Sequence, residues 1–322
     1  MTGFFNGDFM HWSLICFYVI AGIALLYYGA EWLVQGGVAI AERLGIPSLI
    51  IGLTLVSFAT SAPELVVSIS AALAGKGDIS IGNVVGSNIC NIGLILGLSA
   101  LLTPLAVQKQ LLKFDVPLLI AVSLVFAGIG WYFKDFSRLC GILFVLLLTA
   151  YIAWSIYAAR KAGEEGESSE EKCSLLKAVI LVLLGLGALI FGGKFLVSGG
   201  IAIGVKLGIR DAIIGLTIVA IGTSLPELAT SVVAALRKET DIAIGNVVGS
   251  NIFNILAIMG ITPIISPVRS QSIYCWDWVA MLVLTLLLYP FMKSGMKISR
   301  KEGAFYLLLF TGYMVWLVYS AK

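Results

Sequence analysis

Apolar runs recur along the whole chain and are separated by short polar stretches. A run of about 20 apolar residues lets an α-helix cross the hydrocarbon core of a bilayer, whereas a membrane β-barrel would show shorter segments of alternating polarity. The pattern therefore predicts an all-α polytopic membrane protein. We expect ten transmembrane helices, at residues 12–33, 48–74, 79–103, 114–133, 138–159, 175–198, 211–236, 242–265, 273–292 and 302–320.

One connection, residues 160–173, is clearly hydrophilic and rich in glutamate. It divides the chain into a first unit of five spans, residues 1–159, and a second unit of five spans, residues 174–322. We interpret it as a short solvated linker, and a weak calcium-sensing role for its acidic residues is the alternative.

The two units are copies of one another. The stretch IGNVVGSNI at residues 81–89 recurs without change at residues 244–252, and many other positions match at the same offset of 163 (227 − 64). Such identity signals a duplicated unit. Because five is an odd number of crossings, the second copy enters the membrane from the opposite side. The sequence thus predicts an inverted repeat with broken helices at the centre, an architecture typical of secondary transporters with a site near the bilayer midplane.

Composition agrees with this class. The chain is 59% hydrophobic and 12% charged, whereas a soluble domain carries about 25% charged residues. The net charge of +3 is spread over the loops, so we predict no nucleic-acid partner. Thirteen basic residues fall on the side of the linker and eight on the other side. By the positive-inside rule, the linker is cytoplasmic and both termini are outside a multi-pass protein of the cell membrane.

Two glutamates interrupt the apolar spans. Glu64 follows Pro63 in the second span, and Glu227 follows Pro226 in the seventh. A carboxylate at the centre of a span costs about 2.5–3.5 kcal/mol on insertion scales, so it usually marks function. The prolines predict that each span breaks into two half-helices, with the glutamate in the first turn of the second half-helix, where the helix dipole favours a negative charge. We expect the break in the second span to free backbone carbonyls near Ser57 and Phe58.

The third and eighth spans each add a polar stripe. Residues four apart share a helical face, and these stripes consist of Asn83, Ser87 and Asn91 in the third span and Asn246, Ser250 and Asn254 in the eighth. Asn83 and Asn246 fit either a ligand role or interhelical packing. Asp78 and Asp241 are predicted N-caps of these two spans, with an ion-entry role as the alternative.

The predicted centre offers only oxygen donors. Carboxylates, hydroxyls, amides and carbonyls suit hard cations such as Na⁺ and Ca²⁺. Two ionised glutamates at close range repel, so a divalent cation, several monovalent cations or a proton must compensate them. One site that can be neutralised in several ways is the physical basis of exchange. The five cysteines lack metal-ligand spacing and His11 is the single histidine, so we expect no zinc, haem or other cofactor.

Two other classes of function could use the same residues. An intramembrane enzyme could use paired carboxylates, but the chain has no HExxH motif or histidine relay, and we expect no enzymatic activity. A cation channel could use the same oxygens and would show flux without counter-transport.

At these residues the sequence resembles the sodium/calcium exchanger branch of the cation/calcium exchanger superfamily, in its prokaryotic form. The segments 52–97 and 215–260 resemble its two repeats, and the specific motif is GTSLPE followed by IGNVVGSNIFN. The resemblance implies an antiporter that exchanges Na⁺ for Ca²⁺ by alternating access, normally extrudes Ca²⁺ and works as a monomer in the lipid bilayer. Antiport of Ca²⁺ against H⁺ or another monovalent cation is the alternative, although the proton branch usually carries a different signature.

The resemblance also implies a set of ion ligands and a motion. Ser57 and Ala220 would act through their backbone carbonyls. Asn254 stands where some members have aspartate, which makes K⁺ coupling less expected. The first and sixth spans, rich in glycine and without central charges, would slide together. The full ligand set is Ser57, Thr60, Ser61, Glu64, Ser87, Asn91, Ala220, Thr223, Ser224, Glu227, Ser250 and Asn254.

Overall fold

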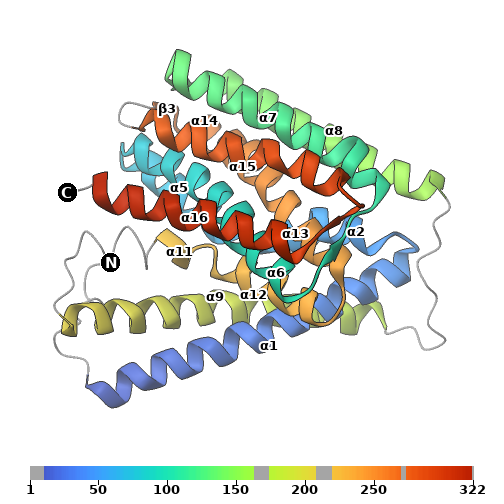
Figure 1. Cartoon of the computed structure of the whole chain (residues 1–322), viewed down its shortest axis with the longest axis horizontal. Coiled ribbons are helices and arrows are strands. Elements are labelled where there is room, and N and C mark those ends of the chain that lie inside the picture. Colours follow the sequence, from blue (N-terminus) through green and yellow to red (C-terminus); the bar gives the residue numbers. More distant parts are fainter. Residues whose placement is uncertain (1–10, 163–173, 208–219, 270–272, 321–322) are drawn as a thin grey trace.

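The computed structural model describes residues 11–162, 174–207, 220–269 and 273–320, and most of them lie in helices (Figure 1). The unbroken helices are α1 (Trp12–Leu44), α8 (Arg138–Ala162), α9 (Leu175–Lys206), α15 (Cys275–Lys293) and α16 (Arg300–Ser320). The third predicted span is α5 (Gly77–Cys90), η3 (Asn91–Leu96) and α6 (Gly97–Leu102), where η marks a π-helical segment. The fourth is η4 (Leu111–Asp115), α7 (Val116–Gly128) and η5 (Ile129–Phe133), and the eighth is α13 (Thr240–Phe253), η7 (Asn254–Ile258) and α14 (Met259–Ile265).

The all-helical membrane class is confirmed. Within the described ranges, eight helices are long and apolar enough to cross a membrane, and the bent pair Ser48–Thr60 and Ala62–Leu73 makes a ninth. The seventh predicted span, 211–236, lies partly outside the described residues, and so does most of the 160–173 linker. The described part of that span is α11 (Ala220–Gly222) and α12 (Leu225–Leu236).

The second predicted span breaks where its proline requires. It consists of α2 (Ser48–Ile51), η2 (Gly52–Val56), α3 (Ser57–Thr60) and α4 (Ala62–Leu73), with a bend of 45° between the two parts. Ser61 at the break has ψ 3°, and Pro63 follows in the first turn of α4, where its missing N–H costs nothing. Ser224, with ψ 8°, and Pro226 make the same junction before α12. The predicted pair of half-helices is therefore confirmed for the second span, and in the seventh span the described part shows the same break before α12.

The carbonyl of Ser57 differs from the expectation. It accepts a hydrogen bond from the Ser61 N–H at 3.0 Å, so the break does not free it. The reason is that α3 keeps its helical turn up to Thr60, and the chain bends only at Ser61. Pro63 has no N–H to donate to the carbonyl of Ala59. The proline therefore removes the helical hydrogen bond of the Ala59 carbonyl and not that of Ser57.

Glycines bring α1 and α9 into close contact along one side of the molecule (Figure 1). A Cβ atom added at Gly22 would lie 3.1 Å from the carbonyl oxygen of Gly192, and one at Gly29 would lie 2.9 Å from that of Gly185. Residue numbers rise along α1 as they fall along α9, so the two helices are antiparallel. Only residues without a side chain permit this approach.

These two helices are longer than the hydropathy pattern predicts. With 33 and 32 residues they continue past the predicted ends at residues 33 and 198. At about 1.5 Å per residue, such helices exceed the hydrocarbon core of about 30 Å. The end of α1 is set by Gly45, whose φ of 63° is left-handed, and not by the end of the apolar run.

The expectation that both helices lack charges in their middle is wrong. Glu31 lies well inside α1 and forms an ion pair with Arg237 at the end of α12, and Lys194 lies well inside α9. Glu31 and Lys194 fall near the ends of the spans predicted from hydropathy, so the hydropathy pattern did not place them in the middle of a helix. Because the helices extend further, these charges are flanked by several helical turns on each side.

Asp78 and Asp241 are not N-caps, so this prediction is wrong. The N-cap residues are Lys76 for α5 and Glu239 for α13, and each aspartate lies two residues further on. The helices begin earlier than the sequence suggests, which places each aspartate in the first turn, where it acts on the helix dipole. Asp241 in addition accepts a hydrogen bond from Gln108 at 2.6 Å.

Two short strand pairs join distant loops, which the helical sequence pattern does not predict. β1 (Leu105–Ala106) pairs with β4 (Lys297–Ile298), and β2 (Asp135–Phe136) pairs with β3 (Val268–Arg269), both antiparallel. These pairings satisfy backbone polar groups where the chain leaves one helix for the next.

The polar centre of the molecule is enclosed by helices. α13 and η7 are buried along their length, since α2, η2, α3 and η3 pack around them. Gly245 and Gly249 permit this, because a Cβ at either would lie within 3.0 Å of a backbone oxygen of the second span. The innermost helix thus carries the polar stripe Asn246, Ser250 and Asn254 into the centre of the molecule.

Candidate functional site

The two intramembrane glutamates lie together at the centre. Glu64 lies in the first turn of α4 and Glu227 in the first turn of α12, and the two residues are 0% and 1% exposed. Each follows a serine and a proline at a helix start, where the helix dipole favours a negative charge. Among the described residues, neither glutamate forms an ion pair with a basic side chain. The negative charge of the centre is therefore not neutralised by lysine or arginine.

The two halves of the chain exchange hydrogen bonds at these acids. Ser61 Oγ donates to Glu227 Oε1 at 3.0 Å, and Ser224 Oγ donates to Glu64 Oε1 at 3.3 Å. Ser224 Oγ also lies 3.5 Å from Ser87 Oγ of the third span. The serine of one broken helix thus holds the carboxylate of the other, which makes the two breaks one site.

Thr60 connects the second span to the eighth. Its hydroxyl lies 3.3 Å from the Ser57 carbonyl oxygen and 3.2 Å from Asn246 Oδ1, both of which can accept its proton. Ser57 Oγ donates to the Thr54 carbonyl at 3.2 Å. These contacts fix the rotamers of two predicted ligands.

Asn83 and Asn246 serve packing in this structure. Asn83 Nδ2 donates to the Glu64 carbonyl oxygen at 3.1 Å and to Ser68 Oγ at 2.9 Å. Asn246 Nδ2 makes the equivalent bonds, to the Glu227 carbonyl at 3.4 Å and to Ser231 Oγ at 2.9 Å. Of the two roles that the sequence leaves open, these bonds favour the structural one, because each amide secures the turn that carries a glutamate.

Asn91 and Asn254 occupy equivalent places in the third and eighth spans. Each is the first residue of a π-helical segment, η3 or η7, and each is at most 1% exposed. Single π-helical turns inside α-helices are frequent at functional sites. Asn254 Nδ2 donates to Asn88 Oδ1 at 3.0 Å, which joins the eighth span to the third.

Several buried oxygens in this region have no protein donor within the described part of the chain. They include Glu64 Oε2, Glu227 Oε2, Asn91 Oδ1, Asn251 Oδ1, Asn254 Oδ1 and Ser250 Oγ. A buried oxygen without a partner is costly, so a cluster of them calls for a bound cation, proton or water. Carboxylate, amide and hydroxyl oxygens are the ligands that Na⁺ and Ca²⁺ prefer.

Close contacts join seven of the twelve predicted site residues: Ser57 with Thr60, Ser61 with Glu227, and Ser224 with both Glu64 and Ser87. Ten of the twelve are buried where the structure describes them, and Thr223 is half-buried. Thr223 lines a cavity of about 510 Å³ between α4, α9 and α12, together with Pro63, Pro226 and Lys194. For Ala220 only the backbone is described, at the start of α11.

Four buried polar residues of this region were not predicted from the sequence: Ser68, Ser231, Asn88 and Asn251. Ser68 and Ser231 receive the Asn83 and Asn246 bonds. All four are present in both copies at the offset of 163, and this identity was the signal that could have found them.

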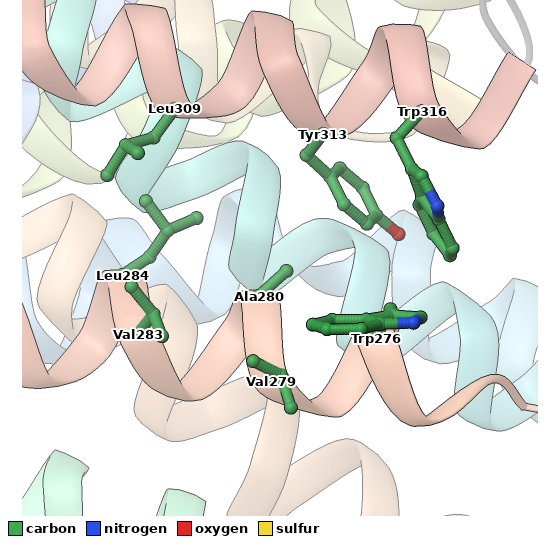
Figure 2. A pocket seen from close by; sticks show the side chains of 8 residues that line it. All are labelled: Trp276, Val279, Ala280, Val283, Leu284, Leu309, Tyr313 and Trp316. Atoms are coloured by element: carbon green, nitrogen blue, oxygen red, sulfur yellow. The ribbon is translucent and has the colours of Figure 1, made fainter. Parts of the chain in front are cut away.

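Two tyrosine–aspartate pairs lie outside this centre, and Asp115 in the first pair is buried while Asp277 in the second is half-buried. Tyr151 donates to Asp115 Oδ1 at 3.0 Å, and Tyr313 donates to Asp277 Oδ1 at 2.9 Å, with the same separation of 36 residues in the chain. Tyr313 also borders a groove of about 400 Å³ between α15 and α16 (Figure 2). Hydrocarbon and indole side chains line the rest of that groove, so it does not provide a set of cation ligands.

Comparison with known proteins identifies the family. The family model described as "Sodium/calcium exchanger protein" matches residues 14–157 and 177–319. The chain belongs to the sodium/calcium exchanger family. This is a family of exchangers and not of enzymes, so the predicted class of activity is confirmed at that level.

Relatives of this exchanger align over nearly its whole length. It is 33% identical over 342 residues to the sodium/calcium exchanger MaX1 of Methanosarcina acetivorans, covering 94% of this chain and 97% of the relative. It is 36% identical over 310 residues to the inner membrane protein YrbG of Escherichia coli, covering 93% and 94%. Among solved structures, the sodium-calcium exchanger NCX_Mj, soaked with Na⁺ and Sr²⁺, superposes with a TM-score of 0.83 at 34% identity, covering 94% of this chain and 98% of that one.

Proposed function

We propose that this exchanger carries Ca²⁺ out of the cell in exchange for Na⁺ that enters, by alternating access, without a cofactor and as a monomer. The observation that carries the proposal is the reciprocal bonding of Glu64 and Glu227 by Ser224 and Ser61. Two buried acids held together without a basic partner need a compensating cation or proton. A single Ca²⁺ or several Na⁺ supply that charge in alternative ways, which is the requirement for exchange.

The proposed ligands are the twelve residues that the family resemblance assigns. Glu64 and Glu227 would bridge Ca²⁺ through the carboxylate oxygens that lack a protein donor. Ca²⁺ takes about six to eight oxygens, more than two carboxylates can offer, so the hydroxyl, amide and carbonyl oxygens of the remaining residues complete its shell. Na⁺ would use the same oxygens in smaller sets. Competition for shared ligands couples the two fluxes.

Several contacts support ten spans arranged as two inverted repeats, with units 1–159 and 174–322 joined by the 160–173 linker. β1 and β3 are equivalent positions of the two copies, and so are β2 and β4, to within one residue. When each strand is replaced by its copy in the other half, the pair β1–β4 therefore becomes the pair β3–β2. The antiparallel packing of α1 against α9, the first helices of the two units, also fits an inverted copy.

Loop pairing supports the crossing of the seventh predicted span. Five described spans separate β1 from β4, which pair and so lie on one side of the membrane. An even number of crossings must lie between them, and span 211–236 supplies the sixth. The start of α1 and the end of α16 lie at the same end of the molecule in Figure 1, which fits both termini outside and the linker in the cytoplasm.

Ions would reach the site along the face between the α1–α9 pair and the remaining helices. The cavity lined by Thr223, Pro63 and Pro226 opens on this face. α1 and α9 pack on each other through glycine backbones, which suits movement of the two as a unit. Their displacement would close one access route and open the other.

The test is Ca²⁺ uptake by proteoliposomes that contain the purified protein. Vesicles loaded with Na⁺ should take up ⁴⁵Ca²⁺, and uptake should stop when the Na⁺ gradient is removed. Uptake that ignores Na⁺ and follows an imposed pH gradient would assign H⁺/Ca²⁺ exchange instead. Flux of either cation without counter-transport would identify a channel and contradict the proposal.

A further inference from the structure

Asn88 makes a bond that its copy in the second half does not make. Its Oδ1 accepts the hydrogen bond from Asn254 Nδ2 at 3.0 Å, across two spans that come from different halves of the chain. Both side chains are at most 1% exposed. An amide has a donor end and an acceptor end, and in this bond Asn254 uses its donor end.

The consequence concerns the other end of Asn254. With Nδ2 engaged, Oδ1 is left without a donor among the described residues and is buried. A cation requires this oxygen and is repelled by the amide N–H₂ group. If the Asn254 amide turned over, the nitrogen would occupy the ligand position instead. Asn88 therefore acts on the orientation of the Asn254 amide, which decides whether a cation can bind there.

The equivalent residue, Asn251, is bonded differently. Its Nδ2 donates to the Val247 carbonyl at 2.6 Å, within its own helix. It is as deeply buried as Asn88, at 0%. Asn251 thus matches Asn88 in residue type, depth and position in the repeat, but its hydrogen bond stays inside α13, and among the described residues its Oδ1 has no partner.

Resting on the proposed function, we propose that Asn88 is a positioning residue that orients the amide of Asn254 with its oxygen toward the transported cation. Asn88 Nδ2 has no partner in the described structure, and an unpaired buried donor is costly. An apolar residue would fill this place at less cost if packing were its only task. The acceptor oxygen of Asn88 is what the site needs from it.

Equilibrium binding of ⁴⁵Ca²⁺ to the purified full-length protein in nanodiscs measures this role without any gradient. Asn88→Ala should weaken Ca²⁺ binding about tenfold, the size expected when one buried hydrogen bond is lost. Thr285→Ala is the control, since it removes a buried hydrogen bond within α15, to the Met281 carbonyl, and should change Ca²⁺ binding less than about twofold. Equal weakening by both variants would overturn the proposal. Asn88→Leu fills the volume without an acceptor and should repeat the Asn88→Ala result should the alanine variant fail to fold.

A second variant separates orientation from packing. Asn254→Asp places an oxygen at both ends of the side chain, so orientation no longer matters. In this background Asn88→Ala should cost less than about twofold, because the two residues then act independently. A tenfold loss that persists in the Asn254→Asp background would assign Asn88 a purely structural role.

The binding assay also distinguishes this inference from the proposed function. A parent protein that binds Ca²⁺ but does not couple its uptake to Na⁺ contradicts only the proposed driving ion. A parent protein that binds no Ca²⁺ contradicts both.

Discussion

Ser61 Oγ lies 3.0 Å from Glu227 Oε1, although 166 residues separate them in the chain. Ser224 makes the corresponding bond to Glu64 at 3.3 Å. Each copy of the repeat therefore supplies the donor for the carboxylate of the other copy. Neither half has a complete site, and the two broken helices cannot separate at their junctions without removing a donor from each acid.

Replacement of the acids should abolish transport. Glu64→Gln and Glu227→Gln keep the side-chain size, remove one negative charge and introduce a donor that opposes a cation. We expect Ca²⁺ uptake to fall about 100-fold or more in either variant, since removing one partner of a buried charge interaction costs about 3–5 kcal/mol. The measurement is ⁴⁵Ca²⁺ uptake into Na⁺-loaded proteoliposomes. Glu302→Gln, at the start of α16, is the control and should keep most of the activity.

Transport that survives both glutamine substitutions would reject the site. A loss in the Glu302→Gln control as large as that of Glu64→Gln would instead point to a general effect of charge removal.

The serine hydroxyls should contribute less than the acids but in equal measure. Ser61→Ala and Ser224→Ala each remove one donor to a buried carboxylate, a bond to a charged group that contributes about 1.5–3 kcal/mol. We expect the apparent KM for Ca²⁺ to rise about tenfold or more in each variant. Ser70→Ala, on the exposed face of the same helix α4, should leave the KM unchanged. An unchanged KM in both site variants would contradict the reciprocal bonding.

The glycine contact between α1 and α9 should not tolerate a methyl group. Gly29→Ala places a Cβ 2.9 Å from the Gly185 carbonyl oxygen, and Gly185→Ala places one 2.7 Å from that of Gly29. Overpacking of this kind costs about 1–3 kcal/mol, so we expect a lower thermal unfolding temperature in detergent. Gly187→Ala on α9 is the matched control, because its Cβ would meet nothing within 4 Å. Equal unfolding temperatures for Gly187→Ala and Gly185→Ala would show that the close approach does not contribute to stability.

The two tyrosine–aspartate pairs should differ in their contribution to stability. Asp115 is fully buried, and among the described residues its Oδ2 has no partner. Asp277 instead accepts a second bond, from the Tyr274 N–H at 3.1 Å. Tyr151→Phe should therefore destabilise the protein by about 1–3 kcal/mol, and Tyr313→Phe by less, because only the first leaves a buried acid without a donor. Thermal unfolding of the two variants compares them, and a larger loss in Tyr313→Phe would refute this account.

The same pairs illustrate a limit of reading the chain alone. Asp115 and Tyr151 recur as Asp277 and Tyr313, but the offset there is one residue shorter than elsewhere. A search at constant offset therefore misses them. Their equal separation of 36 residues was the available signal, and only packing of the helices reveals that the side chains meet.

The position of helix ends is a second limit. Hydropathy located the spans, because the energetic cost of burying charge in lipid is a property of composition. It did not locate the ends of α1 and α9 or the true N-caps of α5 and α13. A helix end depends on backbone conformation, as at Gly45, and on neighbours such as Gln108 beside Asp241, which are not local in sequence.

The sequence by itself determined that the chain is an α-helical membrane protein with two copies of a broken, acidic span. Apolar length, proline and a buried carboxylate each have a local energetic meaning, and these sufficed to single out Glu64 and Glu227. Only the tertiary structure decided which donor serves which acid, that Asn246 packs under Glu227, and that Asn88 holds Asn254. Hydrogen bonds act over about 3 Å, so their partners are set by how the two halves pack and not by spacing along the chain.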